Sequence, residues 1–354
     1  MIRFFGGLRR TLLREGRTLA YLKYAVGELV LVVFGILIAL QVNNWNEQRQ
    51  LRAKADVALL ETLQDLEQMV DRANDVIESA EDKDVILGRI LAGKATAQDY
   101  RDDRNYVAVE QNWEEMTPGV SHEGYDKLMR LADGLPAGYL PPIAALKSLY
   151  LRDVPTVQQT ERFLADFVTR LLQRYGERHA WFSSGIDESY LQYVLHDPLY
   201  RNDIYSYRMY SSGNYLQSVR QLKYQAMLAY QAAHSVVAAD APVPAAMTEV
   251  RWLPEARLRR LEGRYRMPAA SRSAASIAAI TLRGGQLWLN GGANTVCVLF
   301  MTTDDRFICL LLGGDAPRFR FSRDARGAVT GIDVLDGDKV KRHWPRLAGA
   351  QAQP

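Results

Sequence analysis

The sequence predicts an α+β multidomain membrane protein, built from one N-terminal transmembrane helix, an all-α helical-bundle domain and a C-terminal all-β, barrel-like domain. Three observations lead to this fold class. An uninterrupted apolar run occurs early in the chain, apolar residues then recur at helical spacing, and short alternating segments separated by turn residues fill the last part of the 354 residues. The expected parts are a cytoplasmic N-terminus at 1–24, a transmembrane helix at 25–45, a helical domain at 46–235, an Ala/Pro-rich linker at 236–256 and a small antiparallel β domain at 257–348.

The predicted span rests on its length and on its flanks. Every residue from Leu29 to Leu40 is apolar or glycine. Tyr24 and Trp45 flank this run 21 residues apart, which corresponds to about 31 Å of helix, close to the hydrocarbon thickness of roughly 30 Å. Aromatic residues at both ends are typical of the two membrane interfaces. We therefore expect the lipid bilayer to surround residues 25–45.

The charge of the first 24 residues predicts the orientation of the span. Six basic residues stand there against the single acid Glu15, and such a positive flank stays in the cytoplasm. No small-x-small cleavage site follows the apolar run, so an uncleaved signal anchor is favoured. A cleaved signal peptide and a buried core helix are the two alternatives.

One face of the span is a candidate oligomer interface. Glu28, Gly35, Ala39 and Val42 share this face at helical spacing. Gly35 and Ala39 form a small-xxx-small step, which lets two helix backbones approach. The face predicts a homo-oligomer or a contact with another membrane protein. The equal alternative is a tolerated glutamate near the interface together with ordinary small residues.

The stretch YAVGELVLVVFGILIALQVNNWNE resembles the N-terminal signature of a family of bacterial envelope proteins of unknown function. The resemblance covers about the first 50 residues of the chain. It implies a basic N-terminus, one span in the bacterial inner membrane and a helical region in the periplasm. It implies no catalysis.

The region after the span is expected to be a helical bundle. Three stretches carry apolar residues three and four positions apart, as on the buried face of a helix. Thr156 and Gln159, behind Pro155, have the spacing of a capping box and predict a helix start there. The three expected stripes are Leu59, Leu63, Leu66, Val70, Ala73 and Ile77; Leu164, Val168, Leu171, Leu172 and Tyr175; and Leu216, Val219, Leu222, Ala226 and Tyr230.

A tyrosine-rich segment lies between the last two of these stripes. It holds seven tyrosines in 26 residues, from Tyr190 to Tyr215. Tyrosine packs an apolar ring while it keeps a polar tip, so such a segment suits either a bundle core or a recognition groove. We expect core packing for most of these rings. The candidate groove residues are Trp181, Tyr190, Tyr207 and Tyr210.

The sequence contains no recognisable catalytic motif. The five histidines show no HExxH pairing, so we predict no metal site, no cofactor and no catalytic residue. His122, Glu123 and Asp126 lie close together in sequence, and a helix cap or surface cluster explains this spacing best. An envelope enzyme with an unrecognised site in the helical domain remains the alternative. Enzymatic activity is therefore uncertain, and we expect the protein not to be an enzyme.

The C-terminal region is predicted to be an up-and-down barrel or a highly curved sheet. About eight short strands in roughly 90 residues alternate with Gly, Asp and Asn turns. The stretches FRFSRDARGAVTGIDV and LEGRYRM resemble the small β domain that is appended to some penicillin-recognising serine hydrolases. The hydrolase body with its Ser-x-x-Lys motif does not occur in this sequence, so the resemblance implies a fold without the activity.

The two cysteines, Cys297 and Cys309, flank the apparent hairpin turn MTTDDR, equidistant from Thr303. Residues so placed can face each other across a hairpin. Strand cysteines often serve as small apolar residues, and pairs on adjacent strands are strained. We therefore expect two buried thiols, with a disulfide as the alternative that an oxidising periplasm permits.

Charge divides the chain unevenly. Residues 43–240 carry 21 basic and 29 acidic side chains, a net charge of −8, whereas residues 241–354 carry 17 and 10, a net charge of +7. The contrast suggests docking between oppositely charged parts or attraction to an anionic envelope component, and separate solvated surfaces are the alternative. Nucleic acid is an improbable partner. The first hypothesis is a membrane-anchored, self-associating binding or scaffold protein, and a sensory partner of another membrane protein is a further alternative.

Overall fold

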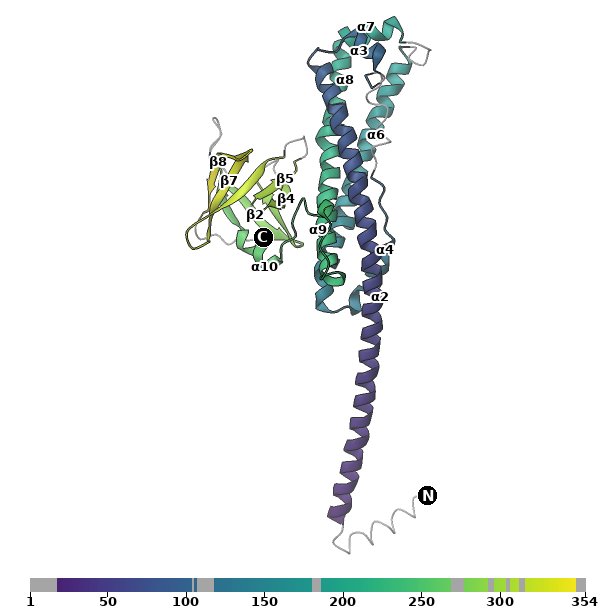
Figure 1. Cartoon of the computed structure of the whole chain (residues 1–354), viewed down its shortest axis with the longest axis vertical. Helices are drawn as coiled ribbons and strands as arrows, with labels where there is room; N and C mark the ends of the chain where they lie inside the picture. The colour runs from purple at the N-terminus through teal and green to yellow at the C-terminus, as the bar shows by residue number, and fades with distance from the viewer. Residues whose placement is uncertain are drawn as a thin grey trace. The chain divides into compact units, whose positions relative to one another are not determined.

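A computed structural model describes residues 18–103, 105–106, 118–179, 186–268, 277–291, 296–303, 306–311 and 316–347, with side chains from Val26 onward (Figure 1). The chain divides into two compact units. The first contains residues 1–55 and 133–135, and the second contains residues 56–132 and 136–354. An N-terminal long apolar helix, a helical region and a C-terminal eight-stranded barrel follow one another, as the sequence predicts.

The first described helix, α2 (Thr18–Leu91), contains the apolar run. The side chains of this run are exposed, for example 65% at Leu29 and 74% at Leu31. The helix is long and apolar enough to cross a membrane. The run takes no part in the core formed by the described residues, which argues against a buried core helix.

The C-terminal part of α2, from Asp56 onward, carries the first predicted stripe into the helical region. Five of its six positions are buried, and Ile77 is half-buried. The second and third stripes are likewise buried apart from Leu172, which is half-buried. The 3.6-residue period of the apolar positions therefore predicts the core correctly, because the same side chains that repeat in sequence meet on one helix face.

The helical region contains α-helices joined by short 3₁₀ and π-helical turns (Figure 1). Among the residues that the structure describes, these elements are α3 (Ala97–Asp102), α4 (Glu123–Met129), η2 (Ala132–Gly134), η3 (Ala137–Tyr139), α5 (Leu140–Ser148), η4 (Leu149–Asp153), α6 (Val154–Gly176), α7 (Glu188–His196), α8 (Pro198–Arg208), η5 (Met209–Tyr215), α9 (Leu216–Val237), η6 (Ala245–Met247), α10 (Glu255–Leu258) and η7 (Arg259–Leu261).

The predicted capping box at Thr156 is wrong. Helix α5, the π-helical η4 and helix α6 follow one another without a break. Because the chain is already helical before Pro155, Thr156 has no helix N-terminus to cap. Its hydroxyl instead donates to the backbone carbonyl of Arg152 at 2.7 Å. A capping box does occur before α3, where Thr96 and Asp99 satisfy each other's backbone N–H groups.

The Ala/Pro-rich segment after α9 is tied to that helix by side-chain hydrogen bonds, among them those of Gln231. The amide of Gln231 donates to the carbonyls of Met247 and Val250, both at 2.6 Å, and its oxygen accepts from the N–H of Trp252 at 2.8 Å. Met247 and Val250 are buried. The segment predicted as a linker is therefore packed where it approaches the β domain.

The eight predicted strands all form, in a single antiparallel sheet with the order β1 to β8 (Figure 1). The sheet is nearly closed, because an isolated bridge joins Tyr265 to Arg346, and the N–H of Leu347 donates to the carbonyl of Arg264 at 2.8 Å. The strands are β1 (Gly263–Arg266), β2 (Ile277–Arg283), β3 (Gln286–Asn290), β4 (Val296–Thr303), β5 (Arg306–Cys309), β6 (Arg318–Arg323), β7 (Val329–Asp336) and β8 (Lys339–Pro345).

Alternate residues of the strands fill the interior of this sheet. On β1, Gly263 and Tyr265 are buried while Arg264 and Arg266 are exposed, as the two-residue period of a strand requires. The rings of Phe307 and Phe321 meet edge to face inside, with centroids 5.1 Å apart. The described arginines of these strands are exposed or half-buried, which explains how a strongly basic domain retains an apolar core.

A buried polar cluster lies within the second unit, around Asp153. The Asp153 carboxylate is 1% exposed and accepts from Arg152 at 2.9 Å and from Gln221 at 2.6 Å. Arg152 also donates to Gln286 of β3 at 2.7 Å, and Gln286 bonds to Gln225 of α9. Burial raises the pKa of the Asp153 carboxyl, against the lowering effect of Arg152. The cluster satisfies a charge that would otherwise be costly to bury.

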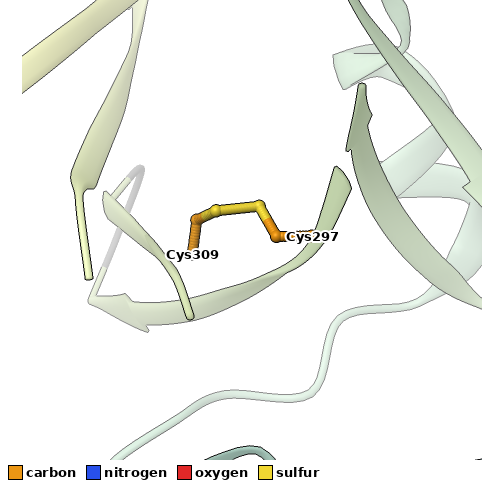
Figure 2. The surroundings of a disulfide bond; sticks show 2 residues. All are labelled: Cys297 and Cys309. Carbon is orange, nitrogen blue, oxygen red and sulfur yellow. A yellow bond between two sulfur atoms is a disulfide. The ribbon is translucent and has the colours of Figure 1, made fainter. Parts of the chain in front are cut away.

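The expectation of free thiols is wrong, because Cys297 and Cys309 form a disulfide (Figure 2). Both side chains are buried, with Cα atoms 5.8 Å apart. Thr303 pairs with Arg306 and Leu299 pairs with Cys309, so the hairpin turn lies after Thr303 and the strands are not symmetric about that residue. The disulfide therefore joins diagonal neighbours on the adjacent strands β4 and β5, and the expectation that a pair on adjacent strands would stay reduced does not hold here.

Reduction of this disulfide is expected to destabilise the barrel by roughly 3 kcal/mol, because the bond closes a short loop in the unfolded chain. Denaturant unfolding of oxidised and reduced protein, followed by Trp344 fluorescence, measures the difference. A Cys297→Ala/Cys309→Ala variant is the control and should respond equally with and without reductant. Equal stability of the oxidised and reduced wild-type protein would contradict the prediction.

Candidate functional site

A cavity of about 460 Å³ opens in the helical region between α2, the end of α8, the π-helical η5 and the start of α9. It is the candidate functional site, and its volume is within the range of small-molecule pockets. Its lining combines acids, arginines, small polar groups and a few apolar side chains: Glu81, Asp84, Tyr205, Arg208, Met209, Ser212, Gly213, Leu216, Gln217 and Arg220.

The π-helical turn shapes one wall of the cavity. Helices α8 and α9 are joined through η5 without leaving a helical conformation. A π-helical turn is wider than an α-helical one and occurs frequently at functional sites. Met209, Ser212 and Gly213 of η5 line the cavity, and Ser211, Gly213 and Tyr215 are buried.

Two ion pairs cross the cavity from α2. The Nε and Nη2 atoms of Arg208 both donate to Asp84 at 2.7 Å, and Nη2 of Arg220 donates to Glu81 at 2.6 Å. The hydrogen bond from Arg208 lowers the pKa of the Asp84 carboxyl below its usual value, although partial burial opposes this. The same bond raises the pKa of Arg208. The formal charges of the two acids and the two arginines cancel.

Gln217 is the most buried polar residue in the lining of the cavity. Its side chain is only 3% exposed, and its Oε1 atom has no hydrogen-bond partner among the described residues. A buried acceptor without a partner costs roughly 1–3 kcal/mol. Natural cores rarely keep such a group unless something else satisfies it.

The Asp84–Arg208 pair predicts an acid-dependent loss of stability. Because the pKa of Asp84 is lowered in the folded chain, the pair stabilises the fold at any pH above the usual value of 3.8. This contribution disappears as the pH falls through the lowered value. The Asp84→Asn variant should therefore be less stable than wild type at pH 7, and the difference should vanish in acid.

Urea unfolding at several pH values between neutral and about pH 2 measures this difference for wild type and variant. Asp82→Asn is the matched control, because Asp82 lies two positions away on α2 with an exposed side chain. A stability difference for Asp84→Asn that does not change with pH would contradict the prediction.

The predicted groove residues do not line this cavity. Tyr190 and Tyr207 are buried in the helical core, and Tyr210 is half-buried against Phe167, with ring centroids 5.1 Å apart. Trp181 lies outside the described residues. The tyrosine-rich segment contributes to the cavity through Tyr205, which is 64% exposed at its rim.

The cluster at His122 forms the exposed start of α4. His122 is the N-cap residue, and its carbonyl accepts from the backbone N–H of Asp126 at 2.9 Å. Its ring lies 5.0 Å from that of Tyr150. The side chains of His122, Glu123 and Asp126 are exposed. Within the described ranges, no group of three or more His, Cys, Asp or Glu residues is placed to hold a metal ion.

The predicted face of the span is open on the structure. Glu28, Gly35, Ala39 and Val42 are all exposed, and a Cβ atom built on Gly35 meets nothing within 4 Å. Because they lie on one helix, these residues share the face that their spacing implied. The occupant of the face is a matter for proposal.

No family model matches the sequence, and no curated protein matches it.

Proposed function

We propose that the chain is a single-pass membrane protein that carries an extracytoplasmic binding domain in the bacterial envelope. The observation that carries this proposal is the exposed apolar run of α2. Twelve consecutive positions from Leu29 to Leu40 lack any polar side chain, and all are exposed. Leaving so much apolar surface in water is unfavourable, at about 25 cal/mol per Å². A bilayer removes this cost.

The disulfide supports the placement of the β domain outside the cytoplasm. Disulfides persist in oxidising compartments and are rare where thiol reductants are present. The Cys297–Cys309 bond lies far along the chain from the apolar run. Together with the basic flank of the run, it favours a cytoplasmic N-terminus and a periplasmic remainder.

The cavity in the helical region supports a ligand-binding function. Its acids and arginines are mutually paired, with distances of 2.6–2.7 Å, so its charges are held in fixed positions. A small number of positioned polar groups lining a cavity is typical of small-ligand sites. We therefore favour a recognition function for the extracytoplasmic part.

A topology test addresses the proposed placement. A periplasm-active reporter fused after Pro354 should be active, and the intact mass of the membrane-bound protein should retain residues 1–24. An active reporter on a chain that has lost its N-terminal residues would show that the apolar run is a cleaved signal peptide and not an anchor. An inactive reporter would overturn the extracytoplasmic placement.

Self-association through the span is expected to depend on the face of Glu28, Gly35, Ala39 and Val42. Combining Gly35→Leu with Glu28→Ala should weaken dimerisation in detergent or bilayers roughly tenfold, because the large side chain separates the backbones. Val33→Leu, on the opposite side of the helix, is the control. Energy transfer between labelled chains measures this association. If the double variant associated as strongly as wild type, the face would have no role in self-association and the helix would serve only as an anchor.

A further inference from the structure

We infer that the cavity between α2, η5 and α9 binds a short peptide with a free amino group and a free carboxylate. The inference rests on the proposed binding function and specifies its ligand. It assigns the peptide carboxylate to Arg208 and Arg220, the amino group to the Glu81 side, and a peptide group to Gln217.

The charge arrangement selects a ligand with both signs. Glu81 and Asp84 lie three positions apart on α2, and Arg208 and Arg220 face them from the other side. A purely anionic ligand would be attracted by the arginines and repelled by the acids, and a purely cationic ligand would meet the reverse. A zwitterion places each charge against its opposite.

The arginines retain donors for a carboxylate. A guanidinium has five N–H groups in a fixed plane. The ion pairs use those of Nε and Nη2 on Arg208 and of Nη2 on Arg220. The remaining N–H groups can donate to a ligand while the ion pairs stay intact, so binding does not require the helices to separate.

Gln217 supplies the second, independent observation. Its amide is buried in the wall of the cavity, and Oε1 lacks a donor within the described chain. A peptide N–H is the donor that it requires. A peptide group also offers a carbonyl to the Nε2 side of the same amide, so the two planar groups can pair edge to edge.

The rim suits an apolar side chain beside these polar groups. Tyr205 and Met209 line the cavity and are exposed, while Leu216 lines it deeper and is buried. A ring and a thioether offer adaptable apolar contact. A cavity of about 460 Å³ accommodates a peptide of a few residues.

The alternative is that the two ion pairs only hold α2 against α8 and α9 and bind no ligand. This reading explains Arg208 and Arg220 but leaves the buried oxygen of Gln217 without a purpose. The two readings differ for the Gln217→Met variant. If Gln217 only fills space, the variant behaves as wild type; if it recognises a peptide, binding falls while stability does not.

The test uses the full-length protein in lipid nanodiscs and isothermal titration calorimetry with tri-alanine as the probe. N-acetylated tri-alanine lacks the amino charge, and tri-alanine amide lacks the carboxylate. We expect tri-alanine to bind and each capped form to bind at least about tenfold more weakly. Gln217→Met should lose about tenfold in affinity without a lower melting temperature. Gln192→Met, an exposed glutamine on α7, is the matched control and should bind as wild type.

Three results would overturn the inference: no binding of tri-alanine up to about 10 mM, equal binding of the capped peptides, or unchanged binding by Gln217→Met. The reporter assay in cells decides the membrane placement separately. Binding by the purified protein together with an inactive reporter would refute the proposed compartment and leave the peptide site standing.

Discussion

Replacing Val33 and Ile36 together by arginine is expected to abolish stable insertion of the chain into the membrane. Both residues lie near the middle of the exposed apolar run. An arginine at the centre of a span costs about 2.5–3.5 kcal/mol on insertion scales, so two cost roughly 5–7 kcal/mol. The protein should move from the membrane fraction to the cytosol or be degraded, and the reporter after Pro354 should lose its activity.

Val33→Leu together with Ile36→Leu is the matched control, because it changes the same positions and keeps their apolar character. This control should stay in the membrane with an active reporter. If the double-arginine variant were also found in the membrane at wild-type level, the apolar run would not be the anchor, and the proposed topology would fail.

Gly124→Ala is expected to destabilise the helical region by roughly 3 kcal/mol, a large part of a typical domain stability. A Cβ atom on Gly124 would lie 2.6 Å from Oγ1, 2.7 Å from the backbone nitrogen and 2.9 Å from Cα of Thr62. Two of these atoms belong to the backbone of α2, so a rotamer change cannot relieve the clash. Helix α4 must instead move away, which also disturbs the bond from the Gly124 N–H to Asp65.

Two other glycines provide controls for this effect. A Cβ atom on Gly138 or Gly88 meets nothing within 4 Å. Gly138→Ala should be nearly neutral, and Gly88→Ala should stabilise α2 by about 0.5–1 kcal/mol, because alanine favours a helix interior. Thermal unfolding followed by circular dichroism compares the three variants. A Gly124→Ala variant as stable as Gly138→Ala would show that α4 is not held closely against α2.

Much of the fold could be predicted from sequence periodicity. The helical stripes and the eight strands depend on short-range repeats, since a buried face imposes its period on neighbouring residues. Details that depend on where one element joins another were missed. Thr156 has the right spacing for a cap, but the preceding turn is already helical. Cys297 does not lie directly opposite Cys309, because the hairpin turn lies after Thr303 and is not centred on it.

The candidate cavity could not be predicted in the same way. Glu81 and Asp84 look like ordinary solvent-facing acids of α2, and Gln217 like a polar residue beside an apolar stripe. These residues form a site because the π-helical turn η5 joins α8 to α9 and so determines where Arg208 and Gln217 lie relative to each other. Tyrosines were named as candidates because of their amphipathic rings, yet the same property allows Tyr190 and Tyr207 to be buried.

The neighbour-to-neighbour order of the sheet has a consequence for how the β domain folds. Each strand from β1 to β8 pairs with the strand next to it in sequence, so every hairpin closes a short loop at small entropic cost. Among the described residues, the contacts between β1 and the end of β8, such as the bridge between Tyr265 and Arg346, join distant parts of the sheet. The domain is therefore able to assemble hairpin by hairpin from β1 onward, with the Cys297–Cys309 bond able to form before β6 is added and the closure by β8 as the final step.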